Sequence, residues 1–171
     1  MERIIIANII SFAGSILMVL IGLIKTRRNI FLAQTAMYGI FALSNLLLNG
    51  FSGMVSNLLG MVRNVFGLKN LLRPWVKALF IALQAGLVAL GGGGEGWLGW
   101  MPVLSAGVFT AFMDCGNEKL LKGVILAVQL PWILYDIAKQ NYSAAAFDIF
   151  TVISNLIGIV LLQRDAKKNQ K

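Results

Sequence analysis

The chain has 171 residues, of which 58% are hydrophobic and 13% charged, and its formal net charge is +8. Soluble domains carry about 25% charged residues, so this composition excludes an ordinary soluble protein and predicts an all-α protein that crosses a membrane several times. The sequence has no histidine and one cysteine, Cys115, which excludes histidine-based catalysis, His or Cys metal clusters and an internal disulfide. We therefore expect no metal and no other cofactor.

Seven apolar stretches divide the chain, and we interpret each, with its flanking residues, as one transmembrane helix. They cover residues 4–24, 30–48, 51–68, 78–90, 97–113, 123–137 and 142–162. A transmembrane helix needs about 20 residues, so seven of them leave no room for a soluble domain. The glycine run at 91–94 lacks the lysine of a phosphate-binding loop and is interpreted as a flexible loop.

The basic residues are distributed unevenly between alternate loops. Twelve of the 15 Lys and Arg residues lie in the first, third and fifth loops and in the C-terminal tail, whereas the N-terminus and the other loops hold only Arg3 and Lys139. Basic residues collect on the cytoplasmic side of membrane proteins. This bias predicts that the N-terminus faces outside and the C-terminus lies in the cytoplasm, and it accounts for the positive charge without nucleic acid as a partner.

An internal repeat is indicated when the chain is shifted by 91 residues without gaps. The positions that then coincide are chemically similar and include polar residues inside the expected helices. The pairs are Asn45 with Asp136, Phe51 with Tyr142, Ser52 with Ser143, Asn57 with Asp148, Asn64 with Asn155, and Gly67 with Gly158. We therefore expect two parallel three-helix repeats, at 1–72 and 95–171, joined by a linker helix at 73–94.

Short motifs carry a resemblance to known families. The segments 57–64 (NLLGMVRN), 101–103 (MPV), 132–136 (WILYD) and 155–157 (NLI) resemble the YgjV-like bacterial inner-membrane family. The three-one-three helix plan is similar to that of the SWEET sugar transporters and related vitamin transporters. The SWEET resemblance implies a substrate-gripping pair of asparagines on the third and seventh helices, which Asn64 and Asn155 match. Pro102 departs from the SWEET pattern of paired hinge prolines, because Ser11 occupies the equivalent place in the first repeat.

Polar residues recur on one face of five of the expected helices, at the i, i+3, i+7 spacing. Polar groups in hydrocarbon are costly unless they are paired or face water. These stripes therefore line a central polar cavity, or they form hydrogen bonds that hold helices together. The candidate substrate-binding residues are Asn57, Arg63, Asn64, Gln129, Trp132, Asp148 and Asn155.

Individual candidates keep alternative interpretations. Arg63 is either a hook for an anion or a carbonyl group beside Asn64, or a snorkelling or ion-paired structural residue. Asp148 lies deeper in the expected bundle than Asp136, which can be interfacial, and an unpaired Asp148 could carry a proton. Trp132 either stacks on a ligand ring or packs in the core.

We expect a small-molecule transporter with a central polar site between the repeats. Alternating access would open this site to one side of the membrane and then to the other. The alternative is a receptor, scaffold or accessory subunit that moves nothing. No nucleophile and base form a pair, so we do not expect an enzyme. The expected partners are the lipid bilayer and a small polar molecule, and a homo-oligomer is compatible with the sequence.

Overall fold

The structure is a computed structural model, and it describes residues 1–21, 27–91, 93–113 and 118–168. Within these residues the chain forms seven α-helices and one 3-10 segment, η1, and contains no strand. The elements are α1 (Glu2–Ile21), α2 (Arg27–Leu47), α3 (Phe51–Leu68), α4 (Pro74–Gly91), η1 (Gly93–Gly99), α5 (Trp100–Phe112), α6 (Glu118–Ala138) and α7 (Tyr142–Lys168).

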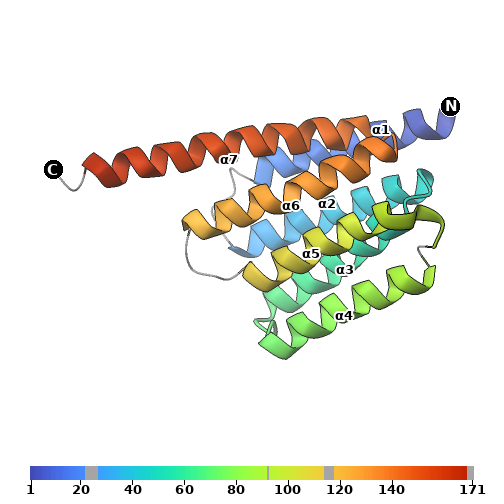
Figure 1. Cartoon of the computed structure of the whole chain (residues 1–171), viewed down its shortest axis with the longest axis horizontal. Helices are drawn as coiled ribbons and strands as arrows, with labels where there is room; N and C mark the ends of the chain where they lie inside the picture. The colour runs from blue at the N-terminus through green and yellow to red at the C-terminus, as the bar shows by residue number, and fades with distance from the viewer. Residues whose placement is uncertain (22–26, 92, 114–117, 169–171) are drawn as a thin grey trace.

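Successive helices run in opposite directions along one bundle (Figure 1). Helices α1, α3, α5 and α7 begin at the end of the bundle that contains Met1, which we name the N-terminal end. Helices α2, α4 and α6 begin at the opposite end, which we name the C-terminal end. The long apolar stretches are joined by short connections, so each helix is followed by an antiparallel helix that packs beside it.

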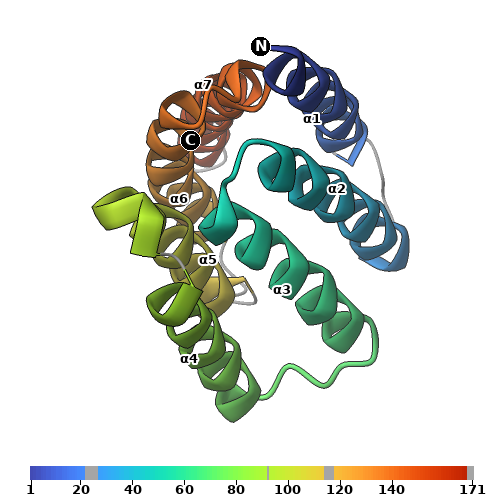
Figure 2. The same ribbon diagram turned by 90° about the vertical axis from the view of Figure 1, so that its right-hand side faces the viewer.

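Six of the described helices form a ring in the order α1, α2, α3, α5, α6, α7, and α7 closes the ring against α1 (Figure 2). Helix α4 lies outside this ring and packs on α3 and α5. The buried amide of Gln84 anchors it there, because Nε2 donates to Ser56 Oγ at 2.6 Å and to the Pro102 carbonyl at 3.2 Å. The ring therefore surrounds an interior to which α4 is peripheral.

Two tight turns at the N-terminal end have the same backbone conformation. Asn49 ends the α2–α3 turn with a φ of 53°, and Gln140 ends the α6–α7 turn with a φ of 59°. In each turn the next residue donates its N–H to the carbonyl five residues earlier, at 2.7 Å and 2.8 Å respectively. This is the bond of a Schellman cap, which favours a left-handed residue such as asparagine. The two turns lie 91 residues apart.

The helix boundaries depart from the apolar stretches mainly at charged ends. Helix α3 has the expected bounds, whereas α4 begins earlier, at Pro74, where a missing N–H costs nothing. The glycine run is not the loop that the sequence suggested, because Gly91 ends α4 and Gly93–Gly99 forms η1. Helix α7 continues to Lys168, since its charged last turns satisfy their own backbone groups in a helix.

The distribution of side chains is polar inside and apolar outside. The fully buried side chains include Tyr135, Asn45, Asn64 and Asn141, whereas many large apolar side chains are exposed. Among the described residues, Pro74–Gly91 is long and apolar enough to span a membrane by length and composition, and three further helices contain shorter apolar segments. A bundle with this distribution buries hydrogen-bonding groups and presents hydrocarbon to its surroundings.

Candidate functional site: a polar cavity inside the ring

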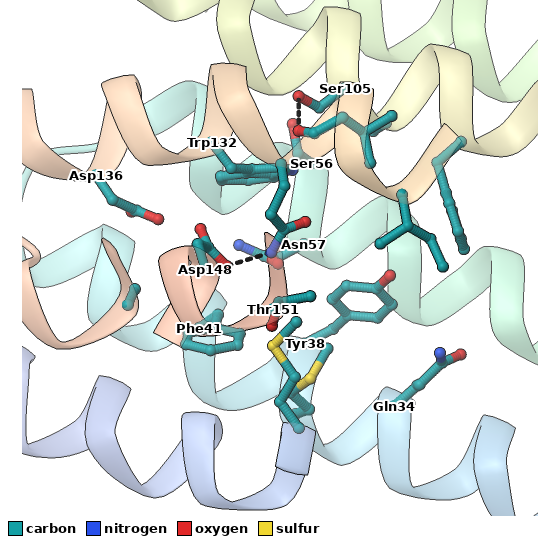
Figure 3. A pocket seen from close by; sticks show the side chains of 18 of the residues that line it. Gln34, Tyr38, Phe41, Ser56, Asn57, Ser105, Trp132, Asp136, Asp148 and Thr151 are labelled. Carbon is teal, nitrogen blue, oxygen red and sulfur yellow. Dashed lines mark hydrogen bonds between the residues drawn. The ribbon is translucent and has the colours of Figure 1, made fainter. Parts of the chain in front are cut away.

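A cavity of about 390 Å³ lies inside the ring, and all six ring helices contribute side chains to its wall (Figure 3). Sites for small molecules have volumes of about 300–1,000 Å³, so the cavity is large enough for a small ligand. Its wall combines aromatic and aliphatic side chains with a few amides, two carboxyl groups and one guanidinium group. Such a wall binds the apolar body of a ligand and orients its polar groups.

Five of the seven candidate binding residues meet at this cavity. Asn57 and Arg63 reach it from α3, Gln129 and Trp132 from α6, and Asp148 from α7. The helical spacing explains the placement of Gln129 and Trp132, which lie three residues apart on one face of α6, but not that of Asn57 and Arg63, which lie six residues apart on α3. Their contact with a ligand stays a prediction, but the sequence pattern brings them to one place.

The expected asparagine pair is not present as a pair on the cavity wall of the described structure. Asn64 is fully buried and is not a wall residue, and its Nδ2 lies 3.4 Å from Gln34 Oε1 on α2. Asn64 therefore faces α2, whereas the neighbouring Arg63 reaches the cavity. Asn155 belongs to α7, but its side chain lies outside the described residues, and the role of this pair remains a prediction.

Two carboxyl groups lie together in the N-terminal half of the cavity. Asp136 and Asp148 point toward one another (Figure 3), and Asp136 is buried rather than interfacial. Gln129 Nε2 donates to Asp148 Oδ1, and Asn141 Nδ2 donates to Asp136 Oδ1 at 3.2 Å. Neighbouring carboxyl groups in a buried site are stabilised when they share a proton or hold a cation, so this pair can bind positive charge.

Arg63 lies nearer the C-terminal end of the cavity and is 3% exposed. Its Nη1 donates to Thr110 Oγ1 at 2.9 Å and its Nη2 to the Tyr38 hydroxyl at 3.0 Å. The guanidinium carbon lies 5.1 Å from the Phe109 ring centroid and 5.8 Å from that of Tyr38. Among the described residues, no carboxylate lies within ion-pair distance of this side chain. Arg63 is therefore neither snorkelling nor paired with a described acid.

Aromatic side chains form much of the remaining wall. Trp132 lies on one side of Asp148 and Phe41 on the other (Figure 3). The Trp132 ring also packs edge-to-face on Tyr135, with 5.9 Å between the ring centroids, so this residue is both a core residue and a wall residue. Phe109 and Ser105 of α5 also line the cavity. The sequence analysis missed them because α5 shows no polar stripe.

A polar cluster closes the N-terminal end of the bundle, and we name Glu95, Tyr135 and Lys139 the Glu95 cluster. Glu95 Oε1 lies 2.6 Å from Lys139 Nζ, and Glu95 Oε2 accepts the Ser52 N–H at 3.0 Å. The Tyr135 hydroxyl accepts the Gly53 N–H at 2.9 Å and donates to Glu95 Oε1 at 3.2 Å. The cluster thus joins η1 and α6 to the beginning of α3.

The charge of Glu95 is favoured by this environment. Burial alone raises the pKa of its carboxyl group, but the hydrogen bonds from Lys139 and Ser52 outweigh burial and hold that pKa below its ordinary value. The sequence analysis placed no function on Glu95. The signal that could have identified it is the isolated basic residue Lys139, which the topology puts at the same end of the bundle.

A matching contact closes the other side of the same end. Asn8 of α1 accepts the Ser143 N–H at 3.0 Å through Oδ1 and donates to the Gln140 carbonyl at 2.8 Å through Nδ2. Ser143 lies 91 residues after Ser52, the residue that Glu95 caps. The beginnings of α3 and α7 are therefore each held by a side chain from the opposite half of the chain.

The described residues close the N-terminal end of the cavity. Its wall residues there, Asn45, Asp136 and Ala144, are buried, and the closing contacts of Glu95 and Asn8 lie beyond them. Toward the C-terminal end Met18 and Gln34 are partly exposed, whereas Arg63 is buried. Residues 22–26 and 114–117, which connect helices at that end, lie outside the described residues.

These features define an all-helical bundle with an apolar exterior and a polar cavity. A family model, Imp-YgjV, described as bacterial inner membrane protein, matches residues 5–166. The chain therefore belongs to this family of bacterial inner membrane proteins. Neither the curated proteins nor the solved structures contain a match to the chain, so the SWEET-like plan is not confirmed.

Proposed function

We propose that this protein is a small-molecule transporter of the inner membrane, in which two three-helix halves expose the central cavity to one side and then to the other. The halves are α1–α3 and α5–α7, with the N-terminal end outside, as the distribution of Lys and Arg favours. The observation that carries the proposal is the cavity itself, because both halves line it and contacts between the halves seal it at one end.

The ring order supports a parallel repeat. In the order α1, α2, α3, α5, α6, α7, the helices opposite each other are α1 with α5, α2 with α6, and α3 with α7. A twofold axis along the bundle exchanges these pairs, and it also exchanges the α3–α5 contact with the α7–α1 contact. The equivalent turns at Asn49 and Gln140 and the equivalent caps at Ser52 and Ser143 obey the same 91-residue shift.

Each half has internal contacts that favour movement as a unit. In the first half, Ser11 Oγ donates to Ser44 Oγ at 2.6 Å, and Ser44 Oγ donates to the Ala7 carbonyl at 2.9 Å. In the second half, Ser105 Oγ donates to the Val128 carbonyl at 2.8 Å. Hydroxyl bonds of this kind hold helices close together in a membrane. The contacts between halves at the N-terminal end are polar and near water, which can replace them when the end opens.

The proposal is tested by asking from which sides the cavity can be reached. In a Cys115→Ser background, Ala144→Cys places a thiol on the cavity wall, and Ala145→Cys is a matched control on the same helix that is buried but not a wall residue. A membrane-impermeant methanethiosulfonate reagent is applied to spheroplasts and to inside-out vesicles.

A transporter allows modification of Ala144→Cys from both sides, at different rates, and leaves Ala145→Cys unmodified. A receptor, scaffold or accessory subunit allows modification from one side at most. One-sided modification under all conditions, including after disruption of the Glu95 cluster, contradicts alternating access.

A further inference from the structure

We infer that the cavity binds a small organic monoanion, a carboxylate with a planar apolar body, whose anionic group contacts Arg63. The ligand is a transport substrate only if the proposed function holds, so this inference rests on that proposal. Binding of the ligand is nevertheless tested without measuring transport. It starts from the position of a buried cation in a cavity wall.

A buried guanidinium group is costly unless an anion compensates its charge. The partners of Arg63 among the described residues are neutral: two hydroxyl groups and two aromatic rings. Its Nε is buried without a hydrogen-bond partner. Because no described carboxylate pairs with this side chain and the side chain lines the cavity, the compensating charge is best supplied by a ligand.

The geometry of the group favours a carboxylate. A guanidinium group has five N–H donors in a planar fork, and the hydrogen bonds to Thr110 and Tyr38 use two of them. Each of Nη1 and Nη2 keeps one further N–H, and a guanidinium group binds a carboxylate through two parallel bonds. Thr110 and the ring of Phe109 hold the guanidinium in place, so little conformational freedom is lost on binding.

The rest of the wall limits the ligand to one anionic group. Asn57 lies six residues before Arg63 on α3, about 9 Å along the helix axis, and Asp148 lies beside Asn57 (Figure 3). A second anionic group at that level would approach the carboxyl pair and be repelled. A hydrogen-bond donor there would be accepted by the carboxyl oxygens. Trp132 and Phe41 provide apolar ring faces at the level of Asp148 (Figure 3), and Tyr38 and Phe109 provide them beside Arg63.

The test compares acids with amides of the same shape. Purified protein in detergent is titrated with benzoate and 4-hydroxybenzoate, each against its primary amide, and with the dianion terephthalate. Binding is followed by thermal stability and by tryptophan fluorescence. We expect at least one of the two carboxylates to bind about tenfold or more tightly than its amide, since a charge-assisted fork distinguishes them, and we expect terephthalate to bind more weakly than 4-hydroxybenzoate.

Variants of Arg63 distinguish loss of the positive charge from loss of the folded structure. Arg63→Met removes the preference for the acid over the amide, and Arg63→Lys keeps part of it because the cation remains. Lys69→Met is the matched control: it removes an exposed cation at the end of the same helix, away from the cavity wall, and retains the preference. If Arg63→Met does not fold, the comparison of Arg63→Lys with Lys69→Met still decides, because only the former changes the cation at the cavity.

The inference is overturned if neither carboxylate binds more tightly than its amide, or if the preference survives Arg63→Met. Its failure is distinguishable from failure of the proposed function. Acid preference with one-sided access to Ala144→Cys retains the anion site and rejects transport, whereas two-sided access without acid preference does the reverse.

Discussion

Replacement of Tyr135 by phenylalanine removes one oxygen atom from the seal at the N-terminal end. The hydroxyl is fully buried, accepts the Gly53 N–H at 2.9 Å and donates to Glu95 at 3.2 Å. A buried N–H without a partner costs about 1–3 kcal/mol. Glu95 keeps its bonds to Lys139 and Ser52, so the free-energy cost at Glu95 is smaller than the cost at the Gly53 N–H. We expect the sealed state to lose about 2 kcal/mol relative to a state in which water reaches these groups.

That loss predicts a measurable change in accessibility. About 1.4 kcal/mol corresponds to a tenfold change in an equilibrium constant, so about 2 kcal/mol increases the open fraction roughly 30-fold. Ala144→Cys should therefore react from the outside roughly 30-fold faster in the Tyr135→Phe background when opening is a rapid pre-equilibrium. Tyr142→Phe is the matched control, because Tyr142 is 59% exposed.

Two results would refute this reasoning. An unchanged external rate would mean that the Tyr135 hydroxyl does not hold the end closed. Equal acceleration at Ala145→Cys would mean that the substitution loosens the whole bundle rather than opening one end.

Three further predictions concern Glu95, Ser44 and Asp148. Because the pKa of Glu95 is held below 4.5, its contribution to the seal is present above that pH and is lost as the pH falls through the lowered value. The external rate at Ala144→Cys is divided by the rate at an exposed reference, Tyr142→Cys, because the reactive thiolate fraction falls with pH at both positions. This ratio should be flat from pH 8 to about 5 and rise in stronger acid, and Glu95→Gln should remove the rise. Ser44→Ala should lower the stability of the protein in detergent by about 1 kcal/mol, seen in denaturant unfolding, and an unchanged stability contradicts a role in holding α1 to α2. Asp148→Asn preserves shape and removes charge, so ligand uptake should lose any response to a pH gradient while exchange without a gradient continues; a retained response excludes Asp148 from coupling.

Periodicity and composition were sufficient to predict the number and order of the helices. The apolar stretches placed α3 at its observed bounds, because Asn49-Gly50 and Lys69 mark its ends clearly. The beginning of α4 and the end of α7 could not be placed in the same way. The first turn of α4 contains Pro74 and Lys77 and the last turns of α7 contain charged residues, which an apolar pattern does not count as helix.

The cavity could be predicted only in part, because spacing identifies a helix face but not its neighbour. Asn57 and Asp148 share a repeat position and both line the cavity. Asn64 fits the repeat equally well, yet it packs against α2, because spacing does not say which neighbouring helix a face meets. Glu95 and Asn8 were missed as seals because the N–H groups of Ser52 and Ser143 that they cap leave no trace in the side-chain pattern, and the one side-chain signal, Lys139, points to Glu95 alone.

The central claim is that the two halves move relative to each other, and distance measurements at both ends test it most directly. In a Cys115→Ser background, double electron–electron resonance is recorded between spin labels at Leu46 and Ile137, which are exposed equivalents near the N-terminal end. A second protein carries labels at Leu32 and Gly123, which are exposed equivalents toward the C-terminal end. The account predicts that Tyr135→Phe lengthens the first distance and shortens the second. One unchanged distance distribution at each end, or a change in the same direction at both, would contradict it.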